Sequence, residues 1–196
     1  MQAAEIELKF PVSDPEAFRH KVESLGFRLE TERTLEHNTL YDTPERSLRE
    51  RRQIVRLRTY GHRCTVTHKR QAAESDTDSR YKTRIETESG VDDCSALAEI
   101  FMQLGYSPVF DYEKFRTEWA FGETGGHLVL DETPIGIWAE LEGEPTWIDA
   151  MMERLGVVAE ESTTASYGRL FLDWKERTGS PAENMTFAEI QLVTSR

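Results

Sequence analysis

The chain has 196 residues, of which 38% are hydrophobic and 10% aromatic, so it can bury a substantial core and is too apolar to stay disordered. Its formal net charge of −12 argues against non-specific binding to nucleic acid, and no apolar run approaches the roughly 18 residues of a transmembrane helix. The charged N-terminal stretch does not resemble a signal peptide, and with no transmembrane run we expect no membrane partner. The two cysteines show no framework spacing, which predicts a reduced, cytoplasmic protein.

The first half of the chain is predicted to open with a strand and a helix. Residues 4–11 alternate charged and apolar side chains, which is the period of a half-buried strand. The run Ser13-Asp14-Pro15-Glu16 then supplies a capping residue, a first-turn proline and acidic residues for a helix that ends at Gly26. The extended segments predicted next, with a helical turn at 45–50 and a polar loop at 71–79 between them, are 27–42, 53–60, 64–70 and 80–88.

The second half repeats this plan of one helix followed by antiparallel strands. Asp92 or Asp93 is predicted to cap a helix that runs to Leu104. The elements predicted after it are strands at 109–121, 127–131 and 135–142 and helices at 147–155 and 166–177. We therefore expect one domain over residues 1–178 and a C-terminal tail over residues 179–196, with a helical turn at 186–191.

The predicted strands gather their charged side chains on one face. Because successive side chains of a strand point to opposite faces, Glu5, Glu7 and Lys9 lie together and Leu8 lies opposite. Applied to the later strands, the same rule gives as many cations as carboxylates. The cations are Lys9, Arg56, Arg58, Lys69, Lys82, Arg84, Lys114 and Arg116, and the carboxylates are Glu5, Glu7, Glu86, Glu88, Glu118, Asp131, Glu140 and Glu142.

Charged faces of this regularity can look outward into water or inward into a closed barrel. The number of strands and the spacing of the turns permit a barrel, which also removes exposed strand edges. An interior that holds both signs of charge is costly to desolvate, so it is not a device for stability. It suits a wet site in which basic side chains bind the oxygens of a highly charged phosphate compound and carboxylates bind Mg²⁺ or Mn²⁺.

Short motifs spread in order over residues 5–170 resemble those of a known family. They are Glu5-x-Glu7-x-Lys9, Tyr41-Asp42-Thr43, Arg56-Leu57-Arg58, Thr67-x-Lys69, Arg84-x-Glu86-x-Glu88, Lys114-x-Arg116, Leu130-Asp131-Glu132, Gly136-x-Trp138-x-Glu140-x-Glu142-Gly143 and Ser166-Tyr167-x-x-Leu170. With these motifs the sequence resembles the CYTH superfamily, the triphosphate tunnel metalloenzymes, which includes triphosphatases and class IV adenylyl cyclases.

The resemblance implies an α+β fold: an eight-stranded antiparallel β-barrel, with helices packed outside and a C-terminal helix near one mouth. It also implies a role for each matching residue. Glu5, Glu7, Glu140 and Glu142 resemble the main metal ligands, and Asp131, Glu86 and Glu88 resemble catalytic residues that hold a second metal ion or orient its water. The residues that resemble phosphate binders are Lys9, Arg56, Arg58, Lys69, Lys82, Arg84, Lys114 and Arg116.

Three functions follow from these expectations. The first is a phosphohydrolase that uses one or two Mg²⁺ or Mn²⁺ ions and acts on inorganic triphosphate or a small organic triphosphate. The second is a class IV adenylyl cyclase that converts ATP to cyclic AMP and pyrophosphate, although the sequence shows no residues that would read the base. The third is a non-catalytic module that binds polyphosphate, for which cations alone would suffice. In each case the expected partner is a small molecule rather than a nucleic acid.

Overall fold

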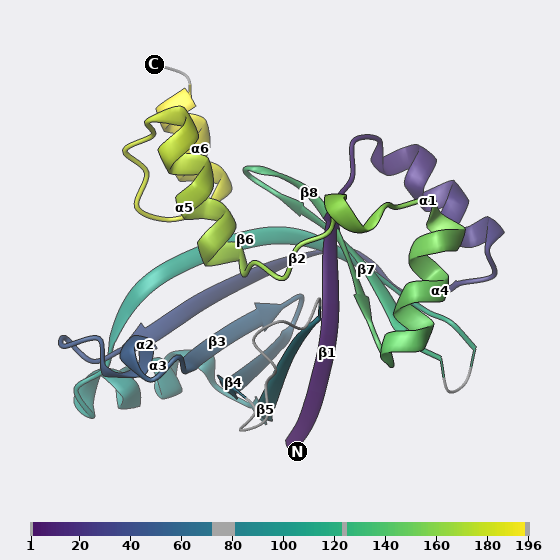
Figure 1. Ribbon diagram of the computed structural model, residues 1–196. Helices are drawn as coiled ribbons and strands as arrows, with labels where there is room; N and C mark the ends of the chain where they lie inside the picture. The colour runs from purple at the N-terminus through teal and green to yellow at the C-terminus, as the bar shows by residue number, and fades with distance from the viewer. Residues whose placement is uncertain (1, 72–80, 123–124, 195–196) are drawn as a thin grey trace.

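The computed structural model describes residues 2–71, 81–122 and 125–194 (Figure 1). The side chains of Glu5 and Lys82 lie outside the described part, as does nearly all of the polar loop predicted at 71–79. No helix in the described ranges is both long and apolar enough to cross a membrane.

In the described part of the chain, eight antiparallel strands close into a barrel in the order β1-β5-β4-β3-β2-β6-β7-β8, which confirms the predicted fold. The strands are β1 (Gln2–Pro11), β2 (Arg28–Asp42), β3 (Ile54–Tyr60), β4 (Arg63–Gln71), β5 (Lys82–Val91), β6 (Ser107–Ala120), β7 (His127–Thr133) and β8 (Gly136–Glu142). The turns between consecutive strands fall where the sequence places glycine, proline and polar residues. Closure pairs every strand on both sides along part of its length.

The first strand closes the barrel by changing partners halfway along its length. Residues 2–7 pair with β5, and residues 7–11 pair with β8, so that Glu7 lies opposite Glu142 and Lys9 lies opposite Glu140. Two carboxylate-bearing strands that are distant in the sequence therefore lie side by side.

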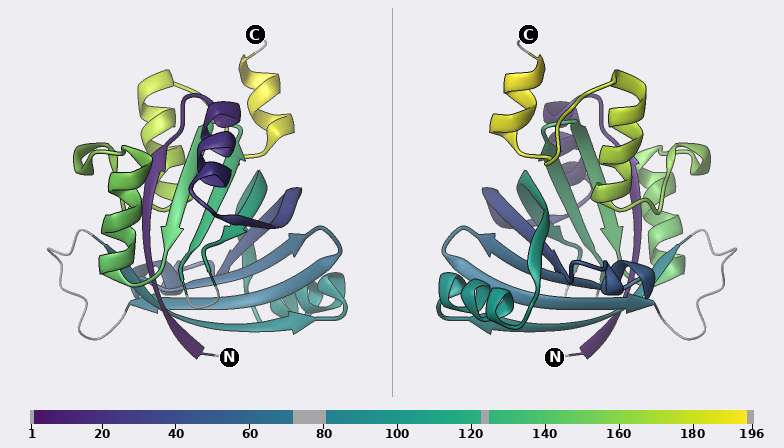
Figure 2. Two further views of the ribbon diagram at one scale, coloured as in Figure 1. Left: turned by 90° about the vertical axis from the view of Figure 1, so that its right-hand side faces the viewer. Right: turned by 90° about the vertical axis from the view of Figure 1, so that its left-hand side faces the viewer.

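Helices pack on the outside of the barrel in the described structure (Figure 2). They are α1 (Pro15–Ser24), α2 (Ser47–Glu50), α3 (Cys94–Gln103), α4 (Pro145–Leu155), a short 3₁₀ turn at Ala159–Glu161, α5 (Tyr167–Thr178) and α6 (Phe187–Thr194). Asp14 caps α1 by accepting a hydrogen bond from the Ala17 amide, and Asp93 caps α3 by accepting one from Ala96. The contact with Ala96 shows that Asp93, rather than Asp92, is the cap of α3.

The hydrophobic core lies between the outer face of the barrel and the helices. Leu8 and Phe10 of β1 pack with Leu128 of β7 against α1 and α4, on which Val22 and Ile148 are fully buried. The alternation of β1 thus sends its apolar side chains outward to the helices and its charged side chains inward. The polar faces of the strands are left to line the interior.

A second apolar cluster holds the C-terminal part of the chain to β6. Ala182, Met185 and Ile190 are buried with Phe171 of α5. Met185 also donates a backbone hydrogen bond to the Asp111 carbonyl and accepts one from the Glu113 amide, both at 3.0 Å. It covers a part of β6 that lies before the pairing with β7 begins at Phe115. The boundary predicted at residue 178 stays a prediction.

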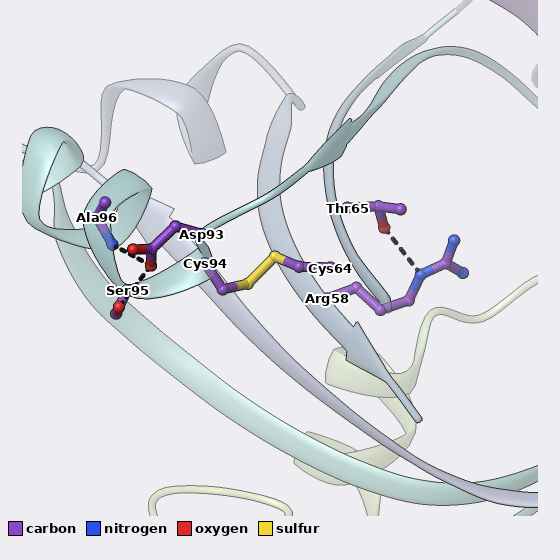
Figure 3. The surroundings of a disulfide bond; sticks show 7 residues. All are labelled: Arg58, Cys64, Thr65, Asp93, Cys94, Ser95 and Ala96. Carbon is purple, nitrogen blue, oxygen red and sulfur yellow. Dashed lines mark hydrogen bonds between the residues drawn. A yellow bond between two sulfur atoms is a disulfide. The ribbon is translucent and has the colours of Figure 1, made fainter. Parts of the chain in front are cut away.

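Cys64 and Cys94 form a disulfide (Figure 3), in contrast to the reduced cysteines expected from the sequence. Cys64 pairs with Val91 across β4 and β5, and the chain enters α3 only three residues later. This register brings the two Cα atoms to 5.9 Å, within the range that a disulfide spans. The spacing of 30 residues in the sequence gave no sign of it. The cytoplasmic location stays a prediction.

Candidate active site in the barrel interior

The interior of the barrel encloses a cavity of about 440 Å³. Most of the predicted site residues face into it, from six of the strands. Those that line it are Glu7, Lys9, Arg56, Arg58, Lys69, Arg84, Glu86, Glu88, Lys114, Arg116, Glu140 and Glu142. Asp131 does not line it, and the side chains of Glu5 and Lys82 lie outside the described part. The period-two reading of the strands therefore placed these side chains on the correct face, while their chemical roles stay predictions.

Three carboxylates gather at the seam between β1 and β8. Glu7, Glu140 and Glu142 can each offer one oxygen such that these oxygens all lie within 4.8 Å of one another. Glu7 and Glu142 face each other directly across the two strands. Like charges in directly opposed positions destabilise a sheet unless a cation lies between or beside them. Among the described residues, this group has the composition and spacing to hold a metal ion.

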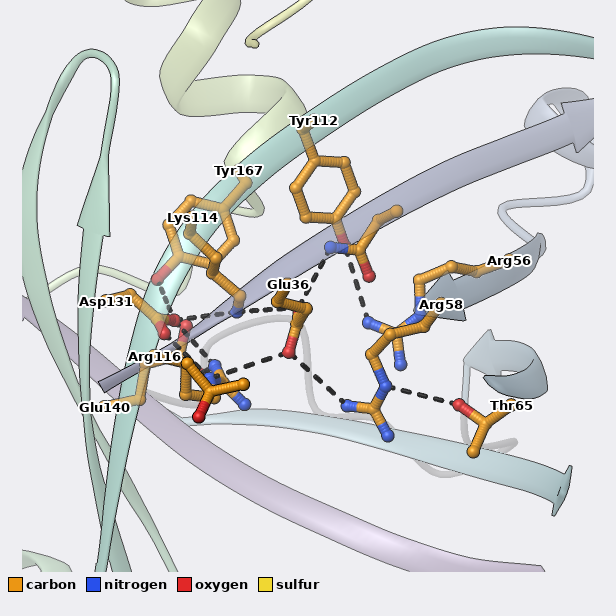
Figure 4. A network of polar contacts seen from close by, with 12 residues as sticks. Glu36, Arg56, Arg58, Thr65, Tyr112, Lys114, Arg116, Asp131, Glu140 and Tyr167 are labelled. Carbon is orange, nitrogen blue, oxygen red and sulfur yellow. Dashed lines mark hydrogen bonds and ion pairs between the residues drawn. The ribbon is translucent and has the colours of Figure 1, made fainter. Parts of the chain in front are cut away.

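Glu140 takes part in a buried network of ion pairs that occupies the same end of the cavity (Figure 4). One of its oxygens contacts the Lys9 ammonium, and the other lies 3.0 Å from Nη2 of Arg116. Burial alone would raise the pKa of Glu140, but Lys9, Arg116 and Lys114 hold that pKa well below its ordinary value. The side chain is thus a carboxylate with a cation on each oxygen, so a metal ion at this position would compete with Lys9 and Arg116.

Asp131 lies behind the cations and does not reach the cavity. Arg116 donates to both of its oxygens, at 2.7 and 2.6 Å. Lys114 and the Tyr167 hydroxyl each donate to Oδ2, at 2.8 and 2.6 Å. The carboxylate is fully buried, and these four donors engage both of its oxygens. In this arrangement it fixes the direction of Lys114 and Arg116, and it lies outside the carboxylate group at the β1–β8 seam.

Tyr167 joins α5 to the cavity. Ser166 caps α5 by accepting a hydrogen bond from the Arg169 amide, which places Tyr167 in the first turn at the cavity wall. Its ring lies 4.6 Å from the Lys9 ammonium and 4.7 Å from that of Lys114. Burial, with Asp131 nearby, raises the pKa of Tyr167 well above its ordinary value, so the hydroxyl stays a hydrogen-bond donor. The start of α5 agrees with the helix predicted at 166–177.

The other end of the cavity is built on β3, β4 and β5 and is more open. Arg58 donates to both oxygens of Glu88 at 3.2 Å, and Thr67 donates to Glu88 at 2.7 Å. Lys69 pairs with Glu86 across β4 and β5. The Glu88 side chain keeps 36% of its surface exposed, whereas Glu140 keeps 5%. Water therefore reaches Glu88 and weakens its ion pairs.

The sequence analysis missed Glu36 and Asn38, both fully buried on β2. The stretch 27–42 was predicted to be extended, but the period-two rule was not applied to it to find which side chains face inward. Glu36, Asn38 and Leu40 alternate in the same way as Glu7 and Lys9 do on β1, and this alternation was the available signal. Asn38 donates to Oε1 of Glu36 at 2.9 Å, so the two residues form one polar unit behind the cavity wall.

These features define the class of the protein: a closed antiparallel barrel with helices packed on its outer face and an interior lined by paired ions. The family model of the CYTH domain matches residues 3–145, and the chain belongs to this family. A search of curated proteins found no match.

Solved structures show the same fold. A candidate adenylate cyclase from Vibrio parahaemolyticus is 20% identical, with a TM-score of 0.71, covering 86% of this chain and 97% of that one. The PH1819 protein from Pyrococcus horikoshii is 23% identical, with a TM-score of 0.70 and coverage of 86% and 98%. A candidate adenylyl cyclase from Hippeastrum, described as having a dominant triphosphatase activity, is 20% identical, with a TM-score of 0.62 and coverage of 88% and 96%.

Proposed function

We propose that this protein is a divalent-metal-dependent phosphohydrolase that acts on inorganic triphosphate or a small organic triphosphate held in the barrel. The observation that carries the proposal is the meeting of a carboxylate group, Glu7, Glu140 and Glu142, with a row of cations in one cavity. Among the described residues, seven cationic and six carboxylate side chains line this cavity. Such a nearly balanced lining gives little net attraction for a polyanion, so strong binding requires added positive charge.

Mg²⁺ or Mn²⁺ is the source of that charge in this proposal. Both ions prefer oxygen ligands, which Glu7, Glu140 and Glu142 supply, and Glu5 joins them on its motif and its place on β1. A bound ion would neutralise charge on the phosphate oxygens and lower the pKa of a bound water. Lys9 and Arg116, which pair with Glu140 in the described structure, are then available to phosphate.

The cations form a path for the phosphate chain. Lys9, Lys114 and Arg116 lie at the buried end, Arg56 and Arg58 follow on β3, and further cations lie toward the open end. Those are Lys69 and Arg84. Lys82 joins the set on its strand position alone, opposite Glu7 in the register of β1 and β5. The planar guanidinium groups can bind two phosphate oxygens at once, and Asp131 keeps Arg116 and Lys114 aimed at the cavity.

The reaction is hydrolysis at the terminal phosphorus. A water oxygen bonds to phosphorus, the bridging P–O bond breaks with its electron pair leaving on the rest of the substrate, and the proton that the water loses passes to solvent. Glu86 and Glu88 line the open end, where water enters, and we assign to them the orientation of that water. Acceleration comes from positioning and from cations that stabilise the charge of the transition state.

Adenylyl cyclase activity is the second candidate. Leu40, Ile54 and Tyr112 line the cavity beside Arg56, and this apolar and aromatic surface suits a planar ring attached to the triphosphate. In that reaction the ribose 3′-hydroxyl attacks the α-phosphorus and pyrophosphate leaves. The same cations and carboxylates would serve either reaction, because they contact the phosphate chain.

One assay separates the candidates. The purified protein is incubated with tripolyphosphate, ATP and thiamine triphosphate, each with Mg²⁺, with Mn²⁺ or with EDTA, and phosphate, pyrophosphate and cyclic AMP are measured. Metal-dependent release of phosphate supports the hydrolase, and cyclic AMP as the main product of ATP supports the cyclase. Binding of tripolyphosphate without any product indicates the non-catalytic module and contradicts the proposal.

A further inference from the structure

Glu36 is a buried carboxylate at the centre of the phosphate-binding cations, and it does not line the cavity. Its Oε1 lies 3.3 Å from the Lys114 ammonium, and its Oε2 lies 3.9 Å from Arg58 and 4.0 Å from Arg116 (Figure 4). The two arginines and the lysine all reach the cavity themselves. Glu36 therefore stands behind the surface that a phosphate chain would touch.

Glu36 is held in its ionised form by the cations around it. Burial alone would favour the protonated acid, but Lys114 and Arg116, followed by Arg56 and Arg58, hold the pKa of the carboxyl far below its ordinary value. Only one of the two carboxylate oxygens of Glu36 nevertheless accepts a hydrogen bond from the described residues. Oε1 accepts a hydrogen bond from Asn38, while Oε2 accepts none from the described residues although it is buried. A buried acceptor without a donor costs free energy, so the position is poorly explained by stability alone.

Glu36 also links the two ends of the cavity. Lys114 and Arg116 belong to the buried end with Asp131, and Arg58 belongs to the open end with Glu88. Among the described residues, Glu36 lies within ion-pair distance of cations from both ends. Its negative charge therefore reduces the positive potential at the middle of the phosphate path.

We infer that Glu36 is an internal counter-ion that limits how tightly the cavity binds a polyphosphate and its products. The inference rests on the proposed function. Binding that is equally strong in the ground state and the transition state does not speed turnover, and tight binding of pyrophosphate or phosphate would slow product release. A fixed carboxylate behind the cations lowers ground-state affinity without blocking the path. Glu36 acts through Arg58, Lys114 and Arg116 and is a positioning residue.

The test is the sign of the change in affinity after Glu36→Gln. This substitution keeps the shape and removes one charge, and a single charge a few ångströms away in a partly buried site alters anion affinity by about tenfold or more. We expect the KM for tripolyphosphate with Mg²⁺ and the inhibition constant of pyrophosphate both to fall about tenfold, and kcat to fall with them. A merely structural role would raise KM. A KM that is unchanged or raised overturns the inference.

Two further variants complete the test. Glu36→Met removes the same charge without adding an amide that needs partners and should also lower KM about tenfold, so it decides the question if Glu36→Gln does not fold; an unchanged or raised KM then overturns the inference. Glu132→Gln removes the same charge from an ion pair with Arg19 and Arg33 that does not line the cavity, and should leave KM unchanged. A wild-type protein that neither binds nor hydrolyses tripolyphosphate contradicts the proposed function instead.

Discussion

The two ends of the cavity are built in different ways. At the buried end, Lys9, Arg116, Asp131 and Glu140 are almost completely withdrawn from water, and each charge has its partners in place. At the open end, Arg58, Lys69 and Glu88 keep part of their surface in contact with water. Charges act most strongly where water is excluded, so the buried end is suited to charge stabilisation and the open end to entry of substrate and water.

The open end has a covalent support that the buried end lacks. The Cys64–Cys94 disulfide closes a loop that contains the β4–β5 hairpin, on which Lys69 and Arg84 lie. The buried end is instead held by ion pairs and by the core beneath α1 and α4. One wall of the cavity is therefore held by ion pairs and packing, and the other also carries a cross-link.

The largest effect is expected from Glu140→Gln at the buried end. The substitution removes the charge of a proposed metal ligand and a partner of Lys9 and Arg116, so kcat should fall by about 10²–10³. Steady-state hydrolysis of tripolyphosphate with saturating Mg²⁺ measures this, with Glu132→Gln as the charge-matched control. A variant with full activity would contradict the assignment of the metal site.

The next effect concerns the disulfide. Closing a loop with a sequence separation of 30 stabilises a fold by about 3 kcal/mol through the loss of entropy in the unfolded chain. Cys64→Ala with Cys94→Ala should lower the free energy of unfolding by that amount, as measured in urea. If the open end depends on this link, hydrogen exchange in β4 and β5 should rise more than in β1 and β8. Equal changes in both pairs of strands would remove the distinction between the two walls.

The free energy of unfolding should depend on pH through a carboxylate at the buried end. The pKa of Glu140 is lowered in the folded protein, so the unfolded state binds its proton first as pH falls. Its contribution to stability is therefore complete above the ordinary pKa of a glutamate, near 4.3, and is lost progressively below it. Urea unfolding from pH 7 down to pH 3.5 should show a smaller decline for Glu140→Gln than for the wild type. Parallel curves would show that another group controls acid stability.

The smallest effect is expected from Lys69→Ala at the open end. The Lys69 and Glu86 side chains keep 16% and 17% of their surface exposed, against 3% and 5% for Lys9 and Glu140, and partly exposed ion pairs contribute about 1 kcal/mol or less. We expect kcat/KM for tripolyphosphate to fall by about tenfold or less, and the loss to shrink further at high salt. A loss as large as that of Glu140→Gln would show that the two ends contribute equally.

Much of this arrangement follows from sequence periodicity. The alternation of Glu7, Leu8, Lys9 and Phe10 predicts which side chains meet the helices and which face inward, and the structure agrees. Periodicity gives the face of a side chain but not its depth, so it could not show that Asp131 lies behind Lys114 and Arg116. Depth depends on which strands become neighbours and on their register.

Two other features were not predicted from the sequence, for separate reasons. Glu36 alternates correctly with Asn38, but a carboxylate in a long extended segment resembles an ordinary exposed residue until the cations around it are known. The disulfide depends on the place where β5 ends and α3 begins, and a shift of a few residues would separate the two cysteines. Both depend on tertiary geometry rather than on local pattern.

The change of partners along β1 has a consequence for how the protein is made. Glu7 reaches its place only when β8 arrives, and Lys9 and its partner Glu140 are 131 residues apart in the chain. During synthesis β1 must therefore wait for β8, the last strand of the described barrel, before the wall is closed. Pairing over such a distance makes folding slow, because the loop entropy is lost before the contacts form. The barrel and its carboxylate group should consequently appear in the same late kinetic step.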